Sequence, residues 1–229
     1  MLEIVYQDEY LIAINKPHGL LVHRSSIATD AKEFALQMLR DQVGRHVSPV
    51  HRLDRKTGGL LLFAFEKEVE VAMQQQFQNG EVKKKYLAVL RGHAPDQMDI
   101  DYPLAKENGT IQEAFTSFVT LMKTELDVPF GKHATSRYSL VEASPTTGRM
   151  HQLRKHFAHI MYPIIGDRKH GCNKQNKFFL EKWEMTTMLL HASELSFKHP
   201  VTGAWITISA GIGSEFRRMT DLMGWPIPA

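Results

Sequence analysis

Residues 60–65 form an uninterrupted apolar run, Leu-Leu-Leu-Phe-Ala-Phe, which directly follows the turn-forming sequence Thr57-Gly58-Gly59. A run of this length next to glycine predicts a buried strand. It is far shorter than the roughly 20 apolar residues that a membrane span needs. The rest of the chain must therefore supply the elements that cover this strand.

Apolar periodicity along the chain predicts many strands and few helices. Further strands are expected at residues 2–6, 11–15, 83–91, 113–122, 137–143, 189–197 and 205–209. Helices are expected from Asp30 to Gly44, after residue 66 as far as Asn79-Gly80, from Thr147 to Met161, and over residues 215–223. Residues 172–186 suggest an irregular basic loop. This pattern predicts an α+β fold around a large, mixed but mostly antiparallel sheet.

Composition excludes several classes of protein but does not choose a partner. The formal charge is only +3, although basic residues cluster at 83–85, 149–155 and 168–177. Such clusters are weak evidence for a nucleic-acid face. Cys172 is the only cysteine, which excludes an internal disulfide and a cysteine-based zinc site. The first nine residues carry acids where a secretory signal would carry Lys or Arg, so we expect a cytoplasmic protein without a membrane segment.

Asp54 lies between two arginines, Arg52 and Arg55, immediately before the predicted buried strand. Positive charges close to a carboxylate favour its ionised form. They also create a field that attracts a polyanion. A surface ion-pair cluster would show the same sequence pattern. The segment therefore indicates a function only in combination with motifs elsewhere in the chain.

Three motifs occur in a fixed order: His51-Arg52-Leu53-Asp54 with the following Thr57-Gly58-Gly59, Lys85-Tyr86, and the segment Gly148-Arg149-Met150-His151-Gln152-Leu153-Arg154. Together with Asn15-Lys16-Pro17-His18-Gly19 and Ile165-Gly166-Asp167, they resemble the RluA family of pseudouridine synthases. The likeness extends from about residue 4 to about residue 210. It implies the pseudouridine synthase fold, with helices and loops flanking the sheet around a central cleft.

The resemblance also implies a domain organisation and a substrate. We expect residues 1–229 to be a single catalytic domain, without the separate N-terminal RNA-binding domain that many relatives carry. The segments Leu21-Val22-His23-Arg24 and Lys169-His170-Gly171 look most like the subgroup that modifies uridine 65 of tRNA. RNA, and specifically tRNA, is thus the expected partner.

The resemblance assigns catalytic roles residue by residue. Asp54 is similar to the family's catalytic aspartate, which either attacks C1′ or removes a ribose proton to give a glycal; the sequence leaves both routes open. Arg154 is similar to the arginine that pairs with this aspartate, and Arg149 is the competing candidate. Tyr86 is similar to the tyrosine that contacts the base. No step needs a metal or an organic cofactor.

Further residues are expected to bind substrate. Arg52 would fill the gap that the flipped uridine leaves in the RNA. Leu195 is similar to the apolar residue that walls the base pocket, and we also expect Arg55, Arg149 and His151 to contact the substrate. No obligate protein partner is expected, and the absence of an obvious seam suggests a monomer.

Alternatives remain at this point. A non-catalytic RNA-binding module would keep the basic clusters, and a synthase of the same family could act on ribosomal RNA. The twelve histidines suggest a metal-dependent hydrolase as another alternative. However, no His-Glu-x-x-His motif occurs, and polar surface and phosphate contacts explain the number of histidines more simply. Two residues depart from the family's pattern: Gly58 replaces a usual Ser and could loosen the turn, and Met150 is expected on the apolar stripe of the helix.

Overall fold

The computed structural model describes residues 1–24 and 32–227. The chain forms two compact units, each built from separate stretches of sequence. Unit 1 comprises Met1–Lys84 and His191–Gly213, and unit 2 comprises Lys85–Leu190 and Ser214–Ala229. The single catalytic domain expected over residues 1–229 stays a prediction.

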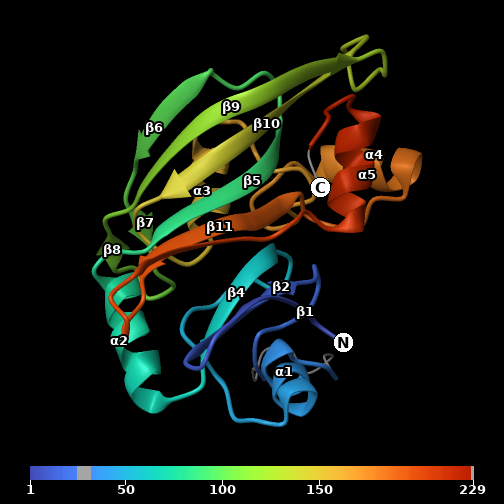
Figure 1. Ribbon diagram of the computed structural model, residues 1–229. Helices are drawn as coiled ribbons and strands as arrows, with labels where there is room; N and C mark the ends of the chain where they lie inside the picture. Colours follow the sequence, from blue (N-terminus) through green and yellow to red (C-terminus); the bar gives the residue numbers. More distant parts are fainter. Residues whose placement is uncertain (25–31, 228–229) are drawn as a thin grey trace. The chain divides into compact units, whose positions relative to one another are not determined.

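Unit 1 is organised around strand β4. Its strands run in the order β1-β2-β4-β11, with β12 paired to β11 and β3 paired to β4 (Figure 1). The elements of this unit are β1 (Glu3–Gln7), β2 (Leu11–Lys16), α1 (Ala35–Val43), β3 (Ser48–Pro49), β4 (Gly58–Ala64), α2 (Lys67–Gln78), β11 (Leu190–Lys198, whose first residue belongs to unit 2) and β12 (Trp205–Ser209). The β4–β11 pair is parallel and the other pairs are antiparallel.

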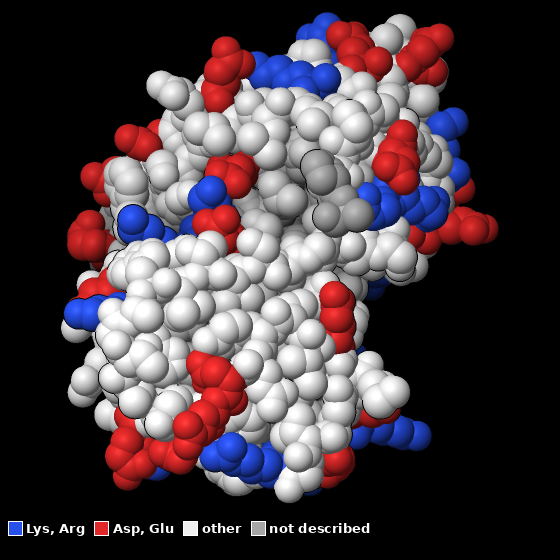
Figure 2. All heavy atoms as spheres, viewed as in Figure 1, with Lys and Arg blue, Asp and Glu red and all other residues white. Residues whose placement is uncertain are grey.

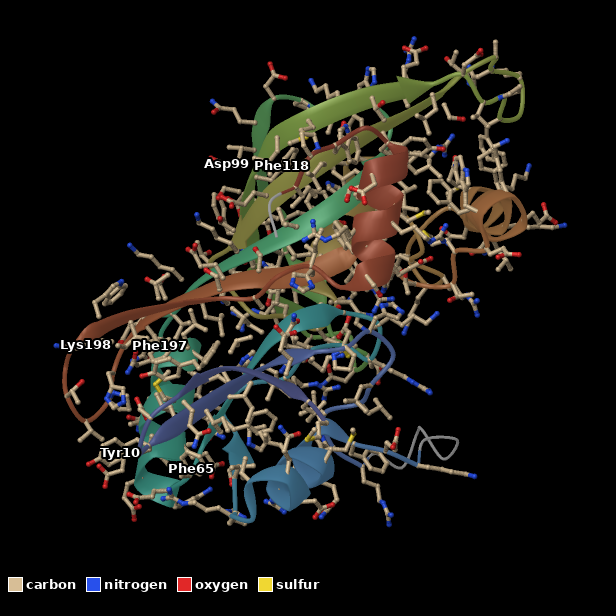
Figure 3. All side chains as sticks on the ribbon, turned by 45° about the vertical axis from the view of Figure 1, so that its right-hand side comes forward. Tyr10, Phe65, Asp99, Phe118, Phe197 and Lys198 are labelled. Atoms are coloured by element: carbon tan, nitrogen blue, oxygen red, sulfur yellow. The ribbon has the colours of Figure 1, made fainter. Side chains whose placement is uncertain are left out.

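Strand β4 overlaps the predicted apolar run of residues 60–65: it begins two residues earlier, at Gly58, and ends one residue earlier, at Ala64. All seven of its residues are buried, as expected for a strand that is covered on both faces. Beyond the end of β4, the Phe65 amide donates a hydrogen bond to the Tyr10 carbonyl at 3.0 Å; both residues are labelled in Figure 3. Burial of so many apolar side chains makes β4 the fixed reference for the loop that precedes it.

Gly59 is required where β4 passes β11. Its φ is +103°, and a Cβ atom there would lie 2.2 Å from the carbonyl oxygen of Ala192. Gly58 is less constrained, since its Cβ would lie 3.3 Å from Nδ1 of His191. The ring of His191 thus occupies the space beside Gly58, which gives a physical reason for a residue without a side chain there.

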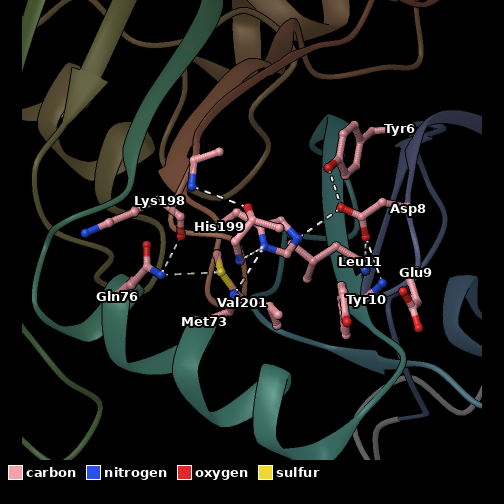
Figure 4. Close-up of polar contacts among 12 residues, drawn as sticks. Tyr6, Asp8, Glu9, Tyr10, Leu11, Met73, Gln76, Lys198, His199 and Val201 are labelled. Carbon is pink, nitrogen blue, oxygen red and sulfur yellow. Dashed lines mark hydrogen bonds and ion pairs between the residues drawn. The ribbon is translucent and has the colours of Figure 1, made fainter.

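A polar cluster joins the β1–β2 turn to the β11–β12 turn (Figure 4). Asp8 accepts hydrogen bonds from the Tyr6 hydroxyl, from His199 Nε2 at 3.0 Å and from the amides of Tyr10 and Leu11. Nδ1 of His199 in turn accepts the amide of Val201. Burial, together with the hydrogen bond and charge of Asp8, raises the pKa of Tyr6 to about 12. These hydrogen bonds therefore hold the two turns together.

Unit 2 contains an antiparallel sheet with α3 packed on it. Its strands run in the order β5-β10-β9-β6, and β7 and β8 form a separate hairpin. The elements are β5 (Lys83–Arg91, which starts in unit 1), β6 (Gln97–Asp101), β7 (Leu104–Ala105), β8 (Ile111–Gln112), β9 (Phe115–Leu126), β10 (Ser136–Pro145), α3 (Gln152–His159), α4 (Asn173–Trp183) and α5 (Ser214–Leu222). Leu153 and Phe157 of α3 join the buried cluster that includes Phe118 of β9, a residue labelled in Figure 3 together with Asp99 of β6.

The structure confirms the α+β class and the mixed, mostly antiparallel pairing of strands. It corrects the interpretation of residues 172–186, because α4 occupies most of this stretch. Gln175 and Phe179 are spaced by one helical turn and are both buried, whereas the Asn and Lys residues between them conceal that stripe in the sequence. None of the helices formed by the described residues has the length and apolar character needed to cross a membrane.

Two predicted helices begin later than expected. Helix α1 begins at Ala35 and ends at Val43, followed by Gly44 with a φ of +62°, while Asp30 and Ala31 lie outside the described residues. Helix α3 begins at Gln152, so Met150 precedes the helix and is 48% exposed. The expectation that Met150 belongs to the apolar stripe is wrong.

The close approach of β4 and β11 yields a stability prediction. We expect Gly59→Ala to lower the free energy of unfolding by at least about 3 kcal/mol, because it adds backbone strain to a direct overlap with the β11 backbone. Gly58→Ala is the matched control and should cost far less. Urea unfolding of both variants measures the difference, and equal stabilities would contradict the contact.

Candidate active site

Asp54 lies in a β-turn that leads directly into β4. The Thr57 amide donates to the Asp54 carbonyl at 3.0 Å, and Thr57 is buried. The side chain of Asp54 is half-buried, whereas Arg52 and Arg55 are exposed. The turn is thus anchored by a buried strand on one side and presents its charged side chains on the other.

Lys16 holds this turn in place from inside unit 1. Only 1% of Lys16 is exposed, and its Nζ donates to the carbonyls of Pro17 at 3.0 Å, Leu20 at 2.9 Å and Arg55 at 3.3 Å. An ammonium group has three donors, so three carbonyls can satisfy it fully. Arg55 adds a hydrogen bond from its Nε to the Gly19 carbonyl at 3.1 Å, and the Gly19 amide returns one to the Arg55 carbonyl at 2.9 Å.

Lys16 is also electrostatically coupled to Asp54. Burial lowers the pKa of Lys16 to about 7, and the negative charge of Asp54 acts in the opposite direction. Sequence reasoning considered only the charges of the flanking arginines. It used Lys16 as part of the motif Asn15-Lys16-Pro17-His18-Gly19, without a contact to the Asp54 turn.

In unit 2, Tyr86 lies near the start of β5. It is half-buried, pairs with Ala143 of β10 and packs against the hydrophobic cluster of this unit. The expected strand is confirmed with identical limits, residues 83–91. The backbone position of Tyr86 is therefore set by a sheet rather than by a loop.

The turn before α3 is held by buried Gln152. Its Oε1 accepts the Thr147 hydroxyl at 2.6 Å and the Arg149 amide at 3.0 Å, and its Nε2 donates to the Phe115 carbonyl at 2.9 Å. His151 has φ +57°, an uncommon conformation for a residue other than glycine. This network fixes the direction in which Arg149 and His151 leave the turn.

Arg149 borders a cavity of about 390 Å³ between the β7–β8 hairpin and the start of α3. Its Nε donates to the Glu113 carbonyl at 2.9 Å, and Nζ of Lys155, another lining residue, donates to the Ala105 carbonyl at 3.1 Å. Neither cation forms an ion pair with a carboxylate within the described part of the chain. Exposed Met150 adds an apolar surface to the same cavity.

Arg154 forms a bidentate ion pair with Asp167, a residue to which the sequence assigned no role. Nε of Arg154 donates to Oδ2 at 2.7 Å and Nη2 donates to Oδ1 at 2.8 Å. Burial alone would raise the pKa of the Asp167 carboxyl, but the hydrogen bonds from Arg154 and from the amides of His170 and Lys169 outweigh it and lower this pKa. Asp167 is therefore a permanent anion at neutral pH.

Several histidines are structural. His156 is fully buried, with Nδ1 3.0 Å from the Thr116 hydroxyl and Nε2 3.0 Å from the Tyr102 carbonyl. Burial lowers the pKa of His191 to about 4, and lowers that of His51, whose Nε2 accepts the Leu62 amide, to about 3. The expectation of polar surface or phosphate contacts is wrong for these residues. The described residues contain no group of three potential metal ligands.

The basic clusters differ in exposure. Lys84 is buried, and Nζ of Lys85 lies 3.4 Å from Glu142, so of residues 83–85 only Lys83 is exposed. Lys174 and Lys177 are exposed on α4. On the face shown in Figure 2, acidic and basic side chains are interspersed.

The predicted site residues fall into two groups. Unit 1 holds Arg52, Asp54 and Arg55 on one loop, and Leu195 on β11, where it is 1% exposed. Unit 2 holds Arg149, His151 and Arg154 at the start of α3, and Tyr86 on β5. That the two groups form one site stays a prediction.

The fold and these motifs together define the class of protein. The chain belongs to the RNA pseudouridylate synthase family, whose profile matches residues 10–159, and it is accordingly an RNA-modifying isomerase. The family resemblance stated from the motifs is thereby confirmed.

Relatives named tRNA pseudouridine synthase C match nearly the whole chain. The Vibrio cholerae protein is 45% identical over 236 residues, which cover 98% of this chain and 97% of that protein. The Haemophilus influenzae protein is 43% identical and covers 98% of this chain and 99% of its own length.

Two human structures share the fold. RNA pseudouridylate synthase domain containing 1 matches with a TM-score of 0.74 at 21% identity, covering 100% of this chain and 97% of that one. RNA pseudouridylate synthase domain containing 4 matches with a TM-score of 0.74 at 24% identity, covering 99% and 95%. These similarities establish the architecture.

The environment of Lys16 predicts a pH-dependent stability. Between its folded pKa of about 7 and its ordinary value of 10.5, the unfolded chain retains a proton that the folded chain releases, so unfolding becomes less favourable as pH rises. Lys16→Met lacks this titration. We therefore expect the destabilisation of Lys16→Met relative to wild type to increase from pH 7 to pH 9, by up to about 1 kcal/mol per pH unit.

Urea unfolding of both proteins at pH 6, 7, 8 and 9 measures this difference. It should be constant below pH 7, where both states of wild type carry the charge. A difference that stays constant up to pH 9 would mean that the three carbonyls keep Lys16 fully protonated.

Proposed function

We propose that this chain isomerises uridine 65 of tRNA to pseudouridine. The full-length similarity to proteins named tRNA pseudouridine synthase C supports the choice of tRNA. The observation that carries the chemistry is the turn that holds Asp54, in which buried Lys16 donates a hydrogen bond to the Arg55 carbonyl. Because tRNA is the proposed substrate, we also propose that the enzyme works in the cytoplasm, as a monomer and without an obligate protein partner.

Asp54 starts the reaction in this proposal. Its carboxylate attacks C1′ or removes a ribose proton, and the N1–C1′ bond breaks. The detached uracil turns over and C5 bonds to C1′, as the bond between Asp54 and C1′ breaks on the first route or as Asp54 returns the proton to the ribose on the second. N1 then takes up a proton, and the proton on C5 leaves to solvent. Both routes need an ionised carboxylate. Because its turn is anchored, the Asp54 carboxylate stays at a constant position while the detached uracil rotates.

Three residues assist Asp54. Arg154 pairs with the Asp54 carboxylate, and Leu195 forms one wall of the base pocket. Tyr86 contacts the base and assists removal of the C5 proton. An ordinary tyrosine titrates near 10, so the surroundings of Tyr86 have to help it accept a proton. The rigid strand that carries Tyr86 supports such a role, since a base must stay aligned with C5.

The remaining residues bind RNA. A synthase reaches C1′ and C5 only after the uridine leaves the stack, and exposed Arg52 replaces it there. Arg55, Arg149 and His151 contact the phosphates or sugars around the flipped nucleotide. Arg149 suits this role because the Glu113 carbonyl orients its guanidinium group without neutralising it.

Two alternatives make different predictions. A ribosomal RNA synthase would share the catalytic residues and differ in the surfaces that select the RNA, such as the β9–β10 hairpin and α4. A non-catalytic RNA-binding module would bind RNA without forming pseudouridine. The anchoring of the Asp54 turn by Lys16 favours catalysis, because phosphate binding alone gives no reason to fix an acidic residue in an RNA-facing loop.

The proposal predicts that Asp54→Asn is inactive but still binds RNA. Tritium release from uridine labelled at C5, in unmodified tRNA and separately in ribosomal RNA, measures the reaction, and mapping the product tests position 65. Release from tRNA should fall to background in Asp54→Asn, with the Kd for tRNA unchanged within about twofold. Asp221→Asn, which alters an exposed acid on α5, is the control.

Release only from ribosomal RNA would replace the substrate and keep the mechanism. Full release by Asp54→Asn would overturn the catalytic assignment. No release from either RNA, with tight binding retained by wild type, would support the binding module.

We also predict that α4 contributes to tRNA affinity. Replacing Lys174 and Lys177 by Glu should weaken binding and reduce the slope of log K against log salt by about 2, because two phosphate contacts are lost. Lys32→Glu with Lys67→Glu is the matched control, since both of these lysines are exposed in unit 1. An equal loss in both double variants would show a general charge effect, and no loss in either would exclude α4 from the interface.

A further inference from the structure

The pair formed by Arg154 and Asp167 has features that stability alone does not explain. We propose that Asp167 is a positioning residue for the isomerisation: it fixes the guanidinium plane of Arg154 so that this arginine meets the catalytic carboxylate in one orientation. The inference rests on the proposed function, in which Arg154 pairs with Asp54. It extends that function by adding a second acid that never touches the substrate.

The geometry restricts Arg154 to one orientation. Asp167 is 1% exposed and the Arg154 side chain is 11% exposed. The contacts at 2.7 Å and 2.8 Å use Nε and Nη2, so the carboxylate lies in the plane of the guanidinium group and prevents its rotation. Because the five N–H donors of arginine form a rigid planar fork, fixing one edge also fixes the direction of the Nη1 edge.

Asp167 is itself held by its own loop. Its Oδ1 accepts the amide of Lys169 at 2.9 Å and the amide of His170 at 3.1 Å. Its carbonyl accepts the Gly171 amide at 3.1 Å and Nδ2 of Asn176 at 2.7 Å. Asn176 belongs to α4, and its Oδ1 also accepts the Gly166 amide at 2.9 Å. The carboxylate is therefore aimed by contacts from two segments of the chain.

Two glycines make this loop possible. Gly166 has φ +83°, and a Cβ atom there would lie 2.0 Å from the Thr187 carbonyl oxygen. A Cβ on Gly171 would lie 2.2 Å from the carbonyl oxygen of Asp167. The backbone thus closes on Asp167 more tightly than any side chain would allow. The spacing Gly-Asp-x-x-x-Gly in the sequence follows from this packing.

The same loop is attached to the strand that carries Tyr86. The Ile165 amide donates to the Val89 carbonyl at 2.9 Å, and the Arg91 amide donates to the Pro163 carbonyl at 3.0 Å. His170 also reaches the start of α3, with its Nε2 2.9 Å from Nδ1 of His151. The Asp167 loop therefore links β5, α3 and α4, the elements of unit 2 that carry the proposed catalytic and RNA-binding groups.

A buried ion pair is a weak source of stability, because the loss of solvation offsets most of the attraction. Holding a reactive group in one orientation is a different benefit: a misplacement of about 1 Å can reduce a rate about 100-fold. The tight loop, the two glycines and the bidentate contact all restrict the orientation of the Arg154 guanidinium group. This is the property that the proposed contact between Arg154 and Asp54 requires.

Asp167→Asn tests the proposal. Asn keeps an acceptor for the loop amides but loses the charge and the second acceptor for Arg154. We expect the single-turnover rate of tritium release from tRNA to fall about 10- to 100-fold, with the Kd for tRNA unchanged within about twofold. A merely structural residue would change stability, or binding and rate together, but would not separate rate from binding.

Glu215→Gln is the matched control. Glu215 accepts Nε and Nη2 of Arg218, each at 2.7 Å, so this variant removes an equally bidentate pair from the same unit, at an exposed position of α5. Glu215 itself is only partly exposed, with 28% of its side chain accessible. The variant should leave the rate unchanged. Urea unfolding of each variant shows whether the protein is folded under assay conditions. If Asp167→Asn does not fold, Asp167→Glu keeps the charge but displaces the carboxylate, and the same loss of rate is expected.

A double-mutant cycle with Arg154→Lys completes the test. Lysine keeps the positive charge but has no planar fork for Asp167 to orient. If Asp167 acts through Arg154, adding Asp167→Asn to Arg154→Lys should reduce the rate little further. Independent, multiplicative losses would overturn the proposal.

The outcomes separate the two levels of inference. Full activity of Asp54→Asn would overturn the proposed function, whatever Asp167→Asn does. Loss of activity in Asp54→Asn and Arg154→Lys, with full activity in folded Asp167→Asn, would overturn only the positioning role.

Discussion

The burial of β4 is the constraint on which the arrangement of unit 1 depends. The strand is covered on both faces, and at Gly59 its backbone meets the backbone of β11 with no room for a side chain. The Asp54 turn ends where this rigid strand begins. Lys16, opposite Gly59 in the β2–β4 register, holds the turn from inside. A carboxylate on a flexible loop would lose alignment, whereas the carboxylate proposed to be catalytic is attached to the best-buried strand of the unit.

Local pattern was enough to predict most of the elements. The limits of β5 and β12 agree with the prediction, and the apolar run predicted β4 to within two residues. Elements whose burial depends on distant partners were not predictable in this way. Helix α4 presents mostly Asn, Lys and Glu in sequence, and its buried stripe is only two residues wide. The two-residue strands β7 and β8 are too short to show any period.

For the candidate site, the sequence predicted the proposed catalytic residues but not the residues that position them. The family resemblance supplied Asp54, Tyr86 and Arg154, whereas the residues that hold them in place came only from the structure. The contact from Lys16 to Arg55 spans 39 positions, and the contact from Gln152 to Phe115 spans 37. The sequence does not distinguish a buried lysine or glutamine from an exposed one. No local pattern reveals that its donors bond to backbone carbonyls far away in the sequence.

The distribution of charge separates the proposed catalytic groups from the groups proposed to bind RNA. In unit 2 the charge of Arg154 is offset by Asp167, whose carboxylate lies 2.7 Å from the guanidinium group. This pair adds no net charge, and the formal charge of the whole chain is only +3. Attraction of a polyanion must then come from cations that no carboxylate neutralises, such as Arg149 and Lys155 beside their cavity. The chain in this way separates two tasks: internal ion pairs orient the reacting groups, and cations held only by carbonyls bind the RNA.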